Sequence, residues 1–264
     1  MKRNTFAAKE FRYTRSDAPV PILQHAGREI RMHLRLRHCK GVVALRGVWL
    51  APRVTLLLEP MDGGTLHQFI RERHEEAQLG QGREVRETDT RARGAALLVA
   101  EVADSVAALH RAGIVHRDIK THNVMMRDSG RESEWEAKVG DLGSAALVPL
   151  EGEAALTEEI GTSGWVAPEV LSGEGYGTKA DIFSLGVVTW ETFVGGTLDN
   201  PMCGLSGETY TSALRAGVRP HLPVSMPAVV HELVVRCWSF DPEGRPTADE
   251  VAAELRAYAA SAVV

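Results

Sequence analysis

The sequence has few cysteines and few aromatic residues. Its 264 residues include three cysteines, and Phe, Trp and Tyr together make up 6% of the chain. Cys39, Cys203 and Cys237 are scattered, so neither a disulfide framework nor a paired-cysteine metal site is expected. An odd number of unpaired cysteines favours a reduced, intracellular compartment, and we expect a cytoplasmic protein.

Long hydrophobic runs and a strong charge of one sign are also lacking. No apolar stretch approaches the roughly 20 residues that span a bilayer, and Met1-Lys2-Arg3 is not followed by the apolar core of a signal peptide. We therefore expect no membrane span. The formal net charge of −5 gives no electrostatic reason to expect a nucleic acid or an anionic membrane as a partner.

What is present is the composition of a globular protein, with 44% hydrophobic and 25% charged residues. Near the N-terminus, Ala26, Ile30 and Leu34 recur every four residues, which predicts a helix. The other apolar runs there are short and bounded by turn residues, which predicts strands. The expected elements are a strand over 5–11, a helix over 22–37, strands over 42–50 and 54–58, and a boundary at 60–64.

After Thr65 the patterns become helical. One apolar stripe, which Gly113 ends, predicts a helix through Leu98, Val102, Val106 and Leu109. Further helices are expected around 182–188 and 230–237, and Thr247 with Glu250 forms a capping box before a last helix. The Arg- and Glu-rich stretch 71–93 favours a solvated loop or a helix extension over a docking segment.

The segment His116-Arg117-Asp118-Ile119-Lys120-Thr121-His122-Asn123 carries residues suited to phosphoryl transfer. The Asp118 carboxylate can orient an attacking hydroxyl, the Lys120 cation can stabilise the moving phosphoryl charge, and the Asn123 amide oxygen can bind Mg²⁺. The alternative is an exposed polar loop without a catalytic role. A set of this kind at fixed spacing seldom recurs by chance, which favours the catalytic interpretation.

This segment resembles the catalytic loop of protein kinases, H-R-D-x-K-x-x-N. Further along, Asp141-Leu142-Gly143 is similar to the metal-binding D-F-G triplet, with Leu in place of Phe. Three later stretches also resemble the family, in order and at sensible spacing: 161–169, 181–186 and 237–247. The resemblance covers nearly the whole chain and implies an α+β, bilobal, protein-kinase-like fold with a small β-rich N-lobe and a large helical C-lobe.

The resemblance also implies how the small lobe would bind a nucleotide. Lys9, in a stretch similar to V-A-I-K, would hold the α- and β-phosphates of ATP, and Glu29 would form an ion pair with it. Backbone groups of Glu59 and Met61 would read the adenine ring at the hinge. ATP and Mg²⁺ are therefore the expected cofactors.

In the large lobe the resemblance implies a catalytic set. Asp118 and Lys120 would act on the substrate, and Asn123 and Asp141 would hold Mg²⁺. Thr162 is expected to bond toward Asp118 and Lys120 and to be structural.

Other residues of the large lobe would support or regulate that set. A buried ion pair would join Glu169 to Arg245, and Asp181 would brace the backbone of the catalytic loop. Thr157 is expected to be a regulatory phosphosite, because Arg117 is a cation that a phosphate would bind.

Two features depart from the family. Only eight residues precede Lys9 and no G-x-G-x-x-G is found there, so we expect a truncated N-lobe over 1–61, a C-lobe over 62–264, and weak ATP binding by this chain alone. Four residues after Glu29, where the family usually has an apolar residue, stands His33. A polar residue there would weaken the packing that holds the active state.

We expect a protein serine/threonine kinase that acts on protein substrates; regulatory partners are not indicated. Lys120 and Gly161-Thr162 resemble the serine/threonine type, and the 237–247 stretch resembles the tyrosine-kinase-like group with its RAF-like and mixed-lineage members. The alternative is a pseudokinase, a binding or scaffolding module, favoured by the missing glycine loop and opposed by the matched polar residues. A small-molecule phosphotransferase is disfavoured by the long stretch from Asp141 to Glu169, which resembles the activation segment of protein kinases.

Overall fold

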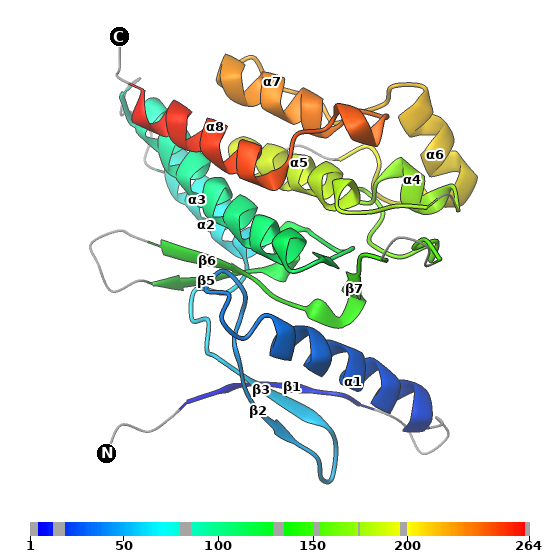
Figure 1. Ribbon diagram of the computed structural model, residues 1–264. Coiled ribbons are helices and arrows are strands. Elements are labelled where there is room, and N and C mark those ends of the chain that lie inside the picture. Colours follow the sequence, from blue (N-terminus) through cyan, green and yellow to red (C-terminus); the bar gives the residue numbers. More distant parts are fainter. Residues whose placement is uncertain are drawn as a thin grey trace.

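The chain folds into a small sheet with one helix, followed by a larger and mostly helical part (Figure 1). The structure is a computed structural model that describes residues 5–12, 19–79, 86–128, 135–149, 154–173, 175–195 and 200–261. This order of elements confirms the α+β class expected from the sequence. Within the described residues, no helix is both long and apolar enough to cross a membrane.

The small sheet has three antiparallel strands in the order β1-β3-β2. They are β1 (Ala7–Glu10), β2 (Leu45–Trp49) and β3 (Thr55–Leu58). Lys9 lies opposite Leu56 in the register of β1 and β3. β2 is shorter than the predicted 42–50, because Val42 leaves this sheet and bridges to Val139 in the larger part.

Helix α1 (Pro19–Arg35) lies between the sheet and the larger part (Figure 1) and contains most of the helix predicted over 22–37. Its buried positions are Ala26, Glu29, Met32 and His33. Met32 belongs to a small apolar cluster that also contains Leu142. The side chain of Leu142, which follows Asp141, therefore packs against α1.

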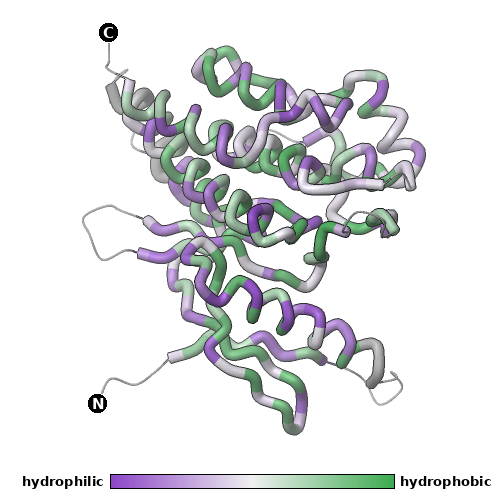
Figure 2. The backbone as a smooth tube through the Cα atoms, viewed as in Figure 1, coloured by the Kyte–Doolittle hydropathy of each residue, from purple (hydrophilic) through white to green (hydrophobic). Residues whose placement is uncertain are grey.

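The helices of the larger part surround α5 (Lys179–Val194), whose residues are almost all buried. The others are α2 (Leu66–Leu79), α3 (Arg86–Arg111), α4 (Pro168–Leu171), α6 (Gly207–Arg215), α7 (Ala228–Cys237) and α8 (Ala248–Ala260). Along them, hydrophilic and hydrophobic residues are interleaved (Figure 2), as expected of helices with one buried face.

The helix predictions for this part are confirmed where the structure describes it. The stripe from Leu98 to Leu109 is buried on α3, and the capping box of Thr247 and Glu250 begins α8. Of the stretch 71–93, residues 71–79 continue α2 and 86–93 begin α3, which agrees with a helix extension. Residues 80–85 lie outside the described part.

Short strands lie between α1 and the helices (Figure 1). They are β4 (Ile114–Val115) with β7 (Ala146–Leu147), and β5 (Val124–Asp128) with β6 (Trp135–Val139). The β5–β6 pair is the hairpin expected before the D-L-G triplet, and its tip at 129–134 lies outside the described residues. The 3₁₀ turns η1 (Thr121–Asn123), η2 (Leu142–Ser144) and η3 (Pro242–Gly244) complete the elements.

A buried ion pair joins α4 to the segment that leads into α8. Arg245 Nη1 and Nη2 donate to Glu169 Oε1 and Oε2 at 2.6 and 2.8 Å. The same guanidinium donates to the backbone carbonyls of Lys179, Ser239 and Phe240. Such a charge is tolerated in the interior because it is paired and hydrogen-bonded. The contact predicted between these distant positions is confirmed.

His33 is buried on α1 without a full set of polar partners. It is 4% exposed, and its Nε2 has no hydrogen-bond partner among the described residues, since Glu29 Oε1 lies 3.9 Å away. Burial lowers the pKa of His33 to about 4, so the ring is neutral near pH 7. A buried polar atom without a partner costs free energy, which supports the expectation that His33 weakens this packing.

Replacing Arg245 with Met should destabilise the fold strongly, because the Glu169 carboxylate stays buried without its partner. The expected loss in the free energy of unfolding is roughly 3–5 kcal/mol. The control is Arg256→Met, whose ion pair with Asp104 is exposed on both sides and should contribute at most about 1 kcal/mol. Urea unfolding measures both losses, and equal small values would contradict the role of the buried pair.

His33→Leu should stabilise the fold by about 1 kcal/mol near pH 7, because it removes the unpartnered atom. The gain should grow toward pH 5, since the unfolded chain takes up a proton near the ordinary pKa of 6.5 whereas folded His33 resists protonation down to about 4. Urea unfolding at both pH values measures this.

A matched variant is His110→Leu on α3, which should be destabilising because His110 Nε2 lies 2.9 Å from Asp181 Oδ2. A loss of stability in His33→Leu would show that the imidazole has a favourable role in the interior.

Candidate active site

Lys9 joins two carboxylates that come from distant parts of the sequence. Its Nζ lies 2.8 Å from Glu29 Oε1 and 2.7 Å from Asp141 Oδ1. Burial by itself would lower the pKa of Lys9, but the two carboxylates outweigh it and raise the pKa above its ordinary value. Burial would likewise raise the pKa of Asp141, and the bond and charge of Lys9 lower it instead. The ion pair predicted between Lys9 and Glu29 is confirmed.

The backbone of the loop that carries Asp118 is held by Asp181 at the start of α5. Asp181 is 1% exposed and accepts hydrogen bonds from the backbone N–H groups of His116 and Arg117, both at 2.8 Å. Arg117 has a φ of 70°, in the left-handed region that side chains seldom occupy, so this support offsets a backbone strain. The bracing role expected for Asp181 agrees with these contacts.

Asp118 is the centre of a second polar cluster. Thr162 Oγ1 donates to Asp118 Oδ1 at 2.6 Å, and Lys120 Nζ donates to Asp118 Oδ2 at 2.8 Å and to Thr162 Oγ1 at 2.7 Å. Asn123 Nδ2 donates to Asp118 Oδ2 at 2.9 Å. The contacts predicted for Thr162 are confirmed. A hydroxyl group that is bound between a carboxylate and an ammonium shows that this cluster can orient a hydroxyl.

Backbone bonds bring the two clusters together. Gly140 N–H donates to the Asn123 carbonyl at 2.8 Å, and His116 Nε2 lies 3.0 Å from the Gly140 carbonyl. Asp141 then takes a left-handed conformation with φ 54°, and Leu142 turns into the apolar cluster on α1. The carboxylate of Asp141 is thereby placed next to the loop that carries Asn123.

The side chains of Asn123 and Asp141 carry oxygen atoms of the kind that Mg²⁺ prefers. The amide nitrogen of Asn123 is used by Asp118, so its carbonyl oxygen is the group left for a cation. The Asp141 side chain is 46% exposed. No group of three or more His, Cys, Asp or Glu that could hold a metal gathers in the described part of the chain. A pair of oxygen donors fits Mg²⁺, which typically takes one or two protein carboxylates and keeps waters and phosphate oxygens.

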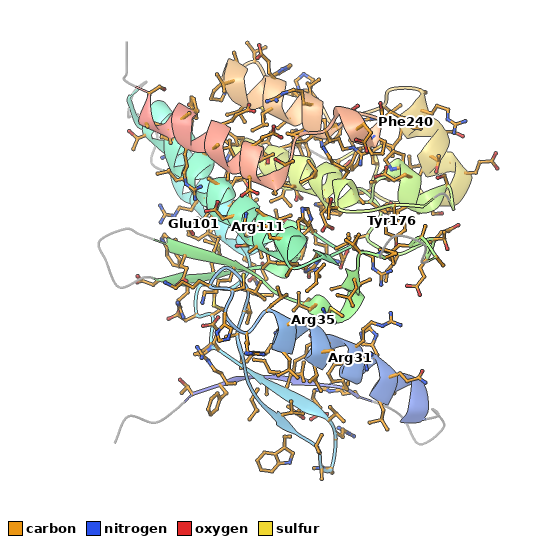
Figure 3. The ribbon with its side chains drawn as sticks, viewed as in Figure 1. Arg31, Arg35, Glu101, Arg111, Tyr176 and Phe240 are labelled. Carbon is orange, nitrogen blue, oxygen red and sulfur yellow. The ribbon has the colours of Figure 1, made fainter. Side chains whose placement is uncertain are left out.

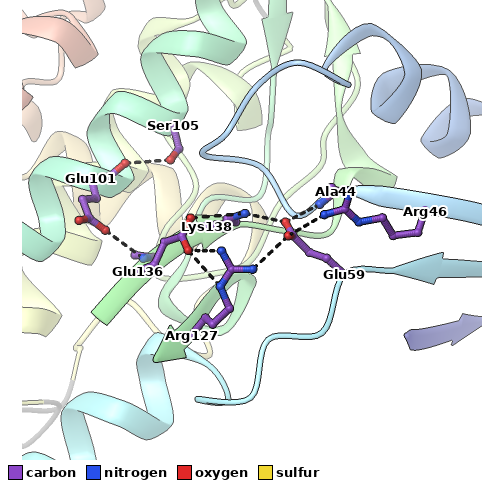
Figure 4. Close-up of polar contacts among 9 residues, drawn as sticks. Ala44, Arg46, Glu59, Glu101, Ser105, Arg127, Glu136 and Lys138 are labelled. Atoms are coloured by element: carbon purple, nitrogen blue, oxygen red, sulfur yellow. Dashed lines mark hydrogen bonds and ion pairs between the residues drawn. The ribbon is translucent and has the colours of Figure 1, made fainter. Parts of the chain in front are cut away.

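Glu59, after β3, has a buried carboxylate that ties the small sheet to the β5–β6 hairpin (Figure 4). Its Oε1 accepts from Ala44 N and Lys138 Nζ at 2.8 Å each, and its Oε2 from Arg127 and Arg46 at 3.3 and 3.4 Å. Burial acts against the charge, yet these donors lower the pKa of Glu59.

This network leaves few groups of Glu59 available to a ligand. The Glu59 side chain is used within the fold and its backbone N–H donates to the Ala44 carbonyl at 2.9 Å, so its backbone carbonyl is the group left for a ligand. Sequence reasoning did not single out the cations of the network, although a lysine between Ala137 and Val139 in an apolar strand was a signal for a buried ion pair.

Arg117 also contacts the segment that carries Thr157. Its side chain is 1% exposed, and Nη1 lies 2.9 Å from Glu158 Oε2 and 3.2 Å from the Tyr176 hydroxyl. Tyr176, labelled in Figure 3, donates in turn to the Glu158 carbonyl at 2.9 Å. Thr157, beside this contact, is exposed. The sequence indicated Arg117 as an anion-binding cation, whereas the part of Tyr176 followed only from the tertiary structure.

Comparisons with known proteins agree with this geometry. A family model described as "Protein kinase domain" matches residues 1–255. The chain is 29% identical over 244 residues to the probable serine/threonine-protein kinase drkA of Dictyostelium discoideum, covering 91% of this chain and 34% of that protein.

Two further relatives come from other lineages. Serine/threonine-protein kinase PkaA of Streptomyces coelicolor is 29% identical over 233 residues, which is 88% of this chain and 39% of that protein. Human mitogen-activated protein kinase kinase kinase 7 is 30% identical over 228 residues, 84% of this chain and 34% of that protein. The chain thus spans less than two fifths of each of these relatives. Since the family model matches almost the entire sequence, the chain belongs to the protein kinase domain family.

Proposed function

We propose that this chain is a protein serine/threonine kinase that transfers the γ-phosphoryl group of ATP to Ser or Thr hydroxyls of protein substrates. The observation that carries the proposal is the joining of two clusters, Lys9 with Glu29 and Asp141, and Asp118 with Lys120. Each holds charges of the kind that phosphoryl transfer needs, and phosphoryl transfer depends mainly on positioning and electrostatic stabilisation.

In this proposal Asp118 orients the acceptor hydroxyl and takes up its proton, while the hydroxyl oxygen forms the new bond to phosphorus and ADP leaves. The bound Thr162 hydroxyl supports this role, since it donates to Asp118 at 2.6 Å. Lys120 contacts both groups and stabilises the charge on the transferred group. Mg²⁺, when bound through Asn123 and Asp141, would supply neutralising charge to the phosphates.

The remaining site residues position the nucleotide. Lys9 binds the α- and β-phosphates, and Glu29 holds Lys9 in place, as their 2.8 Å contact supports. Backbone groups of Glu59 and Met61 bind the adenine ring. We place the lobe boundary after Met61, with an N-lobe over 1–61 and a C-lobe over 62–264, because β3 ends just before it and α2 follows.

The serine/threonine type is supported by the Lys120–Thr162 contact and by the names of the relatives from Streptomyces coelicolor and Dictyostelium discoideum. The tyrosine-kinase-like group is supported by the stretch 237–247, in which Cys237, Trp238 and Arg245 are buried.

The second candidate function is a pseudokinase, a binding module with a kinase fold. The buried and unpartnered His33 beside Glu29 favours it, since it weakens support for the Lys9–Glu29 pair. Titration calorimetry with Mg·ATP, combined with an assay of phosphoryl transfer, separates the two functions. Impaired Mg·ATP binding together with absent transfer would favour the pseudokinase, for which impaired ATP binding is expected.

Asp118→Asn should reduce turnover by roughly 100-fold or more, because the amide cannot take up the proton of the acceptor hydroxyl. The fold should be kept, since the asparagine side chain has nearly the same shape. The control is Asp249→Asn, which removes an exposed carboxylate of α8 that pairs only with Arg111 among its described ion pairs. Phosphate transfer from labelled ATP to a pool of serine peptides measures turnover, and unchanged activity in Asp118→Asn would overturn the assignment.

Phosphorylation of Thr157 should raise activity, since a phosphate carries more negative charge than Glu158 and can occupy Arg117 in its place. Thr157→Ala should therefore lower the activity of protein purified in its active form several-fold, whereas Thr209→Ala, at an exposed position of α6, should have no effect. Mass spectrometry of the active protein checks the modification directly. Active protein in which Thr157 is always unmodified would rule out the regulatory role.

A further inference from the structure

The N-terminal part of the chain carries the opposite charge from the rest. Residues 1–61 contain twelve Lys and Arg against four Asp and Glu, whereas residues 62–264 contain 18 against 31. The net charges are therefore +8 and −13, which together give the −5 of the whole chain. In the described part of residues 1–61, most of the exposed cations lie on α1 and directly after it.

Three arginines form a row along α1, called here the arginine row. Arg28, Arg31 and Arg35 follow one another at spacings of three and four residues, which places them on one side of the helix. Arg31 and Arg35 are exposed and Arg28 is partly exposed; Figure 3 shows the first two along α1. The acidic residue of α1, Glu29, is buried and bound to Lys9. No carboxylate in the described part of the chain forms an ion pair with the arginine row.

The stability of α1 does not explain the arginine row. Like charges three or four residues apart on a helix repel each other. The C-terminal end of a helix favours cations, but this accounts only for Arg35, which lies in the last turn. Arg28 and Arg31 lie further inside the helix. A repulsion of this kind is relieved when negative charges of a partner lie across the row.

An apolar row runs beside the arginines. Leu23 and Leu34 are 52% and 53% exposed, and Gly27 lies between them on the same side of α1. In the described part of the chain, a Cβ added at Gly27 would have no atom within 4 Å. The fold therefore has room for a side chain here, although glycine inside a helix is unfavourable.

The missing side chain of Gly27 leaves an open hollow between the two rows. The hollow is lined by Leu23, Gln24, Gly27, Arg28 and Arg31. A glycine that the fold does not need for its own packing lets the backbone of another element approach closely.

The two rows and the hollow fit one shape of partner. Rows of side chains at spacings of three and four residues are the ridges along which two helices pack. A hollow in such a surface receives a side chain of the second helix. A membrane or a nucleic acid would also be attracted by the arginine row, but neither makes use of a hollow over a glycine.

We propose that this side of α1 is the docking surface for an acidic amphipathic helix of a partner protein. Apolar side chains of that helix pack on Leu23 and Leu34 and enter the hollow over Gly27, while its Glu or Asp residues pair with the arginine row. The apolar contact supplies affinity, and the charges fix the orientation and exclude basic helices. The surface is separate from the residues proposed to act in phosphoryl transfer.

The test measures the binding of a designed probe to residues 1–264. The probe is a fluorescent peptide as long as α1, 17 residues, with leucines along one side and glutamates beside them. It is cross-linked into a helix, because isolated helices of this length are marginal in water. A second probe has lysine in place of each glutamate. Fluorescence anisotropy should show that the glutamate probe binds at least about 10-fold more tightly than the lysine probe.

Two variants test the arginine row and the hollow separately. Arg31→Glu should weaken binding of the glutamate probe about 10-fold and strengthen binding of the lysine probe. Gly27→Leu fills the hollow without a change of charge and should also weaken the glutamate probe about 10-fold; the free space at this position allows the variant to fold. The control is Arg91→Glu, which reverses an exposed arginine of α3 and should leave both affinities unchanged.

Equal affinity for the two probes, or unchanged binding in both Arg31→Glu and Gly27→Leu, would overturn the proposal, as would a failure of the glutamate probe to bind. Two other occupants are tested in parallel. A dimer in sedimentation of the chain alone that is lost in Arg31→Glu would assign the surface to a second copy. Phosphatidylserine vesicles that bind as tightly as the glutamate probe would assign it to a membrane. Either result would also overturn the proposal.

Discussion

The carboxylate of Asp181 holds two consecutive backbone amides, those of His116 and Arg117, at 2.8 Å each. Because both amides are fixed, Arg117 keeps its left-handed conformation and the next residue, Asp118, points to the cluster with Thr162 and Lys120. The cost of burying Asp181 is offset by these bonds and by His110, which together lower its pKa despite burial. The geometry of the candidate active site depends on this one buried charge.

The rigidity behind Asp181 comes from the apolar core. α5 is buried along almost its entire length, so the residues at its two ends are fixed relative to each other. Asp181 near one end holds the catalytic loop, and Glu191 near the other bonds Trp165 and Thr121. One apolar helix therefore fixes both the loop that carries Asp118 and the buried Trp165 ring.

The small sheet is joined to the rest of the chain by charges rather than by a large apolar surface. Lys9 reaches Asp141 across the two parts, and Glu59 reaches Arg127 and Lys138. The Lys9–Asp141 pair is partly exposed and the Glu59–Lys138 pair is buried. Ion pairs of either kind add little net stability compared with apolar packing, while their geometry fixes one arrangement. This suits a protein whose nucleotide and substrate groups come from both parts.

The sequence by itself determined the order of elements and the chemical type of the site. Both depend on patterns that are local in the sequence. The apolar stripe through Leu98 repeats at helical spacing, and Thr247 caps its helix together with Glu250, three positions away. The segment around Asp118 carries its polar groups within one short loop. The long-range pair of Glu169 and Arg245 followed from resemblance to a family, since no local pattern links residues so far apart.

The tertiary structure alone decided which residues that are distant in the sequence come into contact. Three contacts join residues whose neighbours in the sequence give no signal. His67 stacks on His122, Tyr176 bonds to the Arg117–Glu158 contact, and the Glu59 side chain is used inside the fold. The start of β2 at Leu45 instead of Val42 has the same origin, because Val42 bridges to Val139. Contacts of this kind depend on how the helices and the hairpin pack, and local periodicity carries no information about that packing.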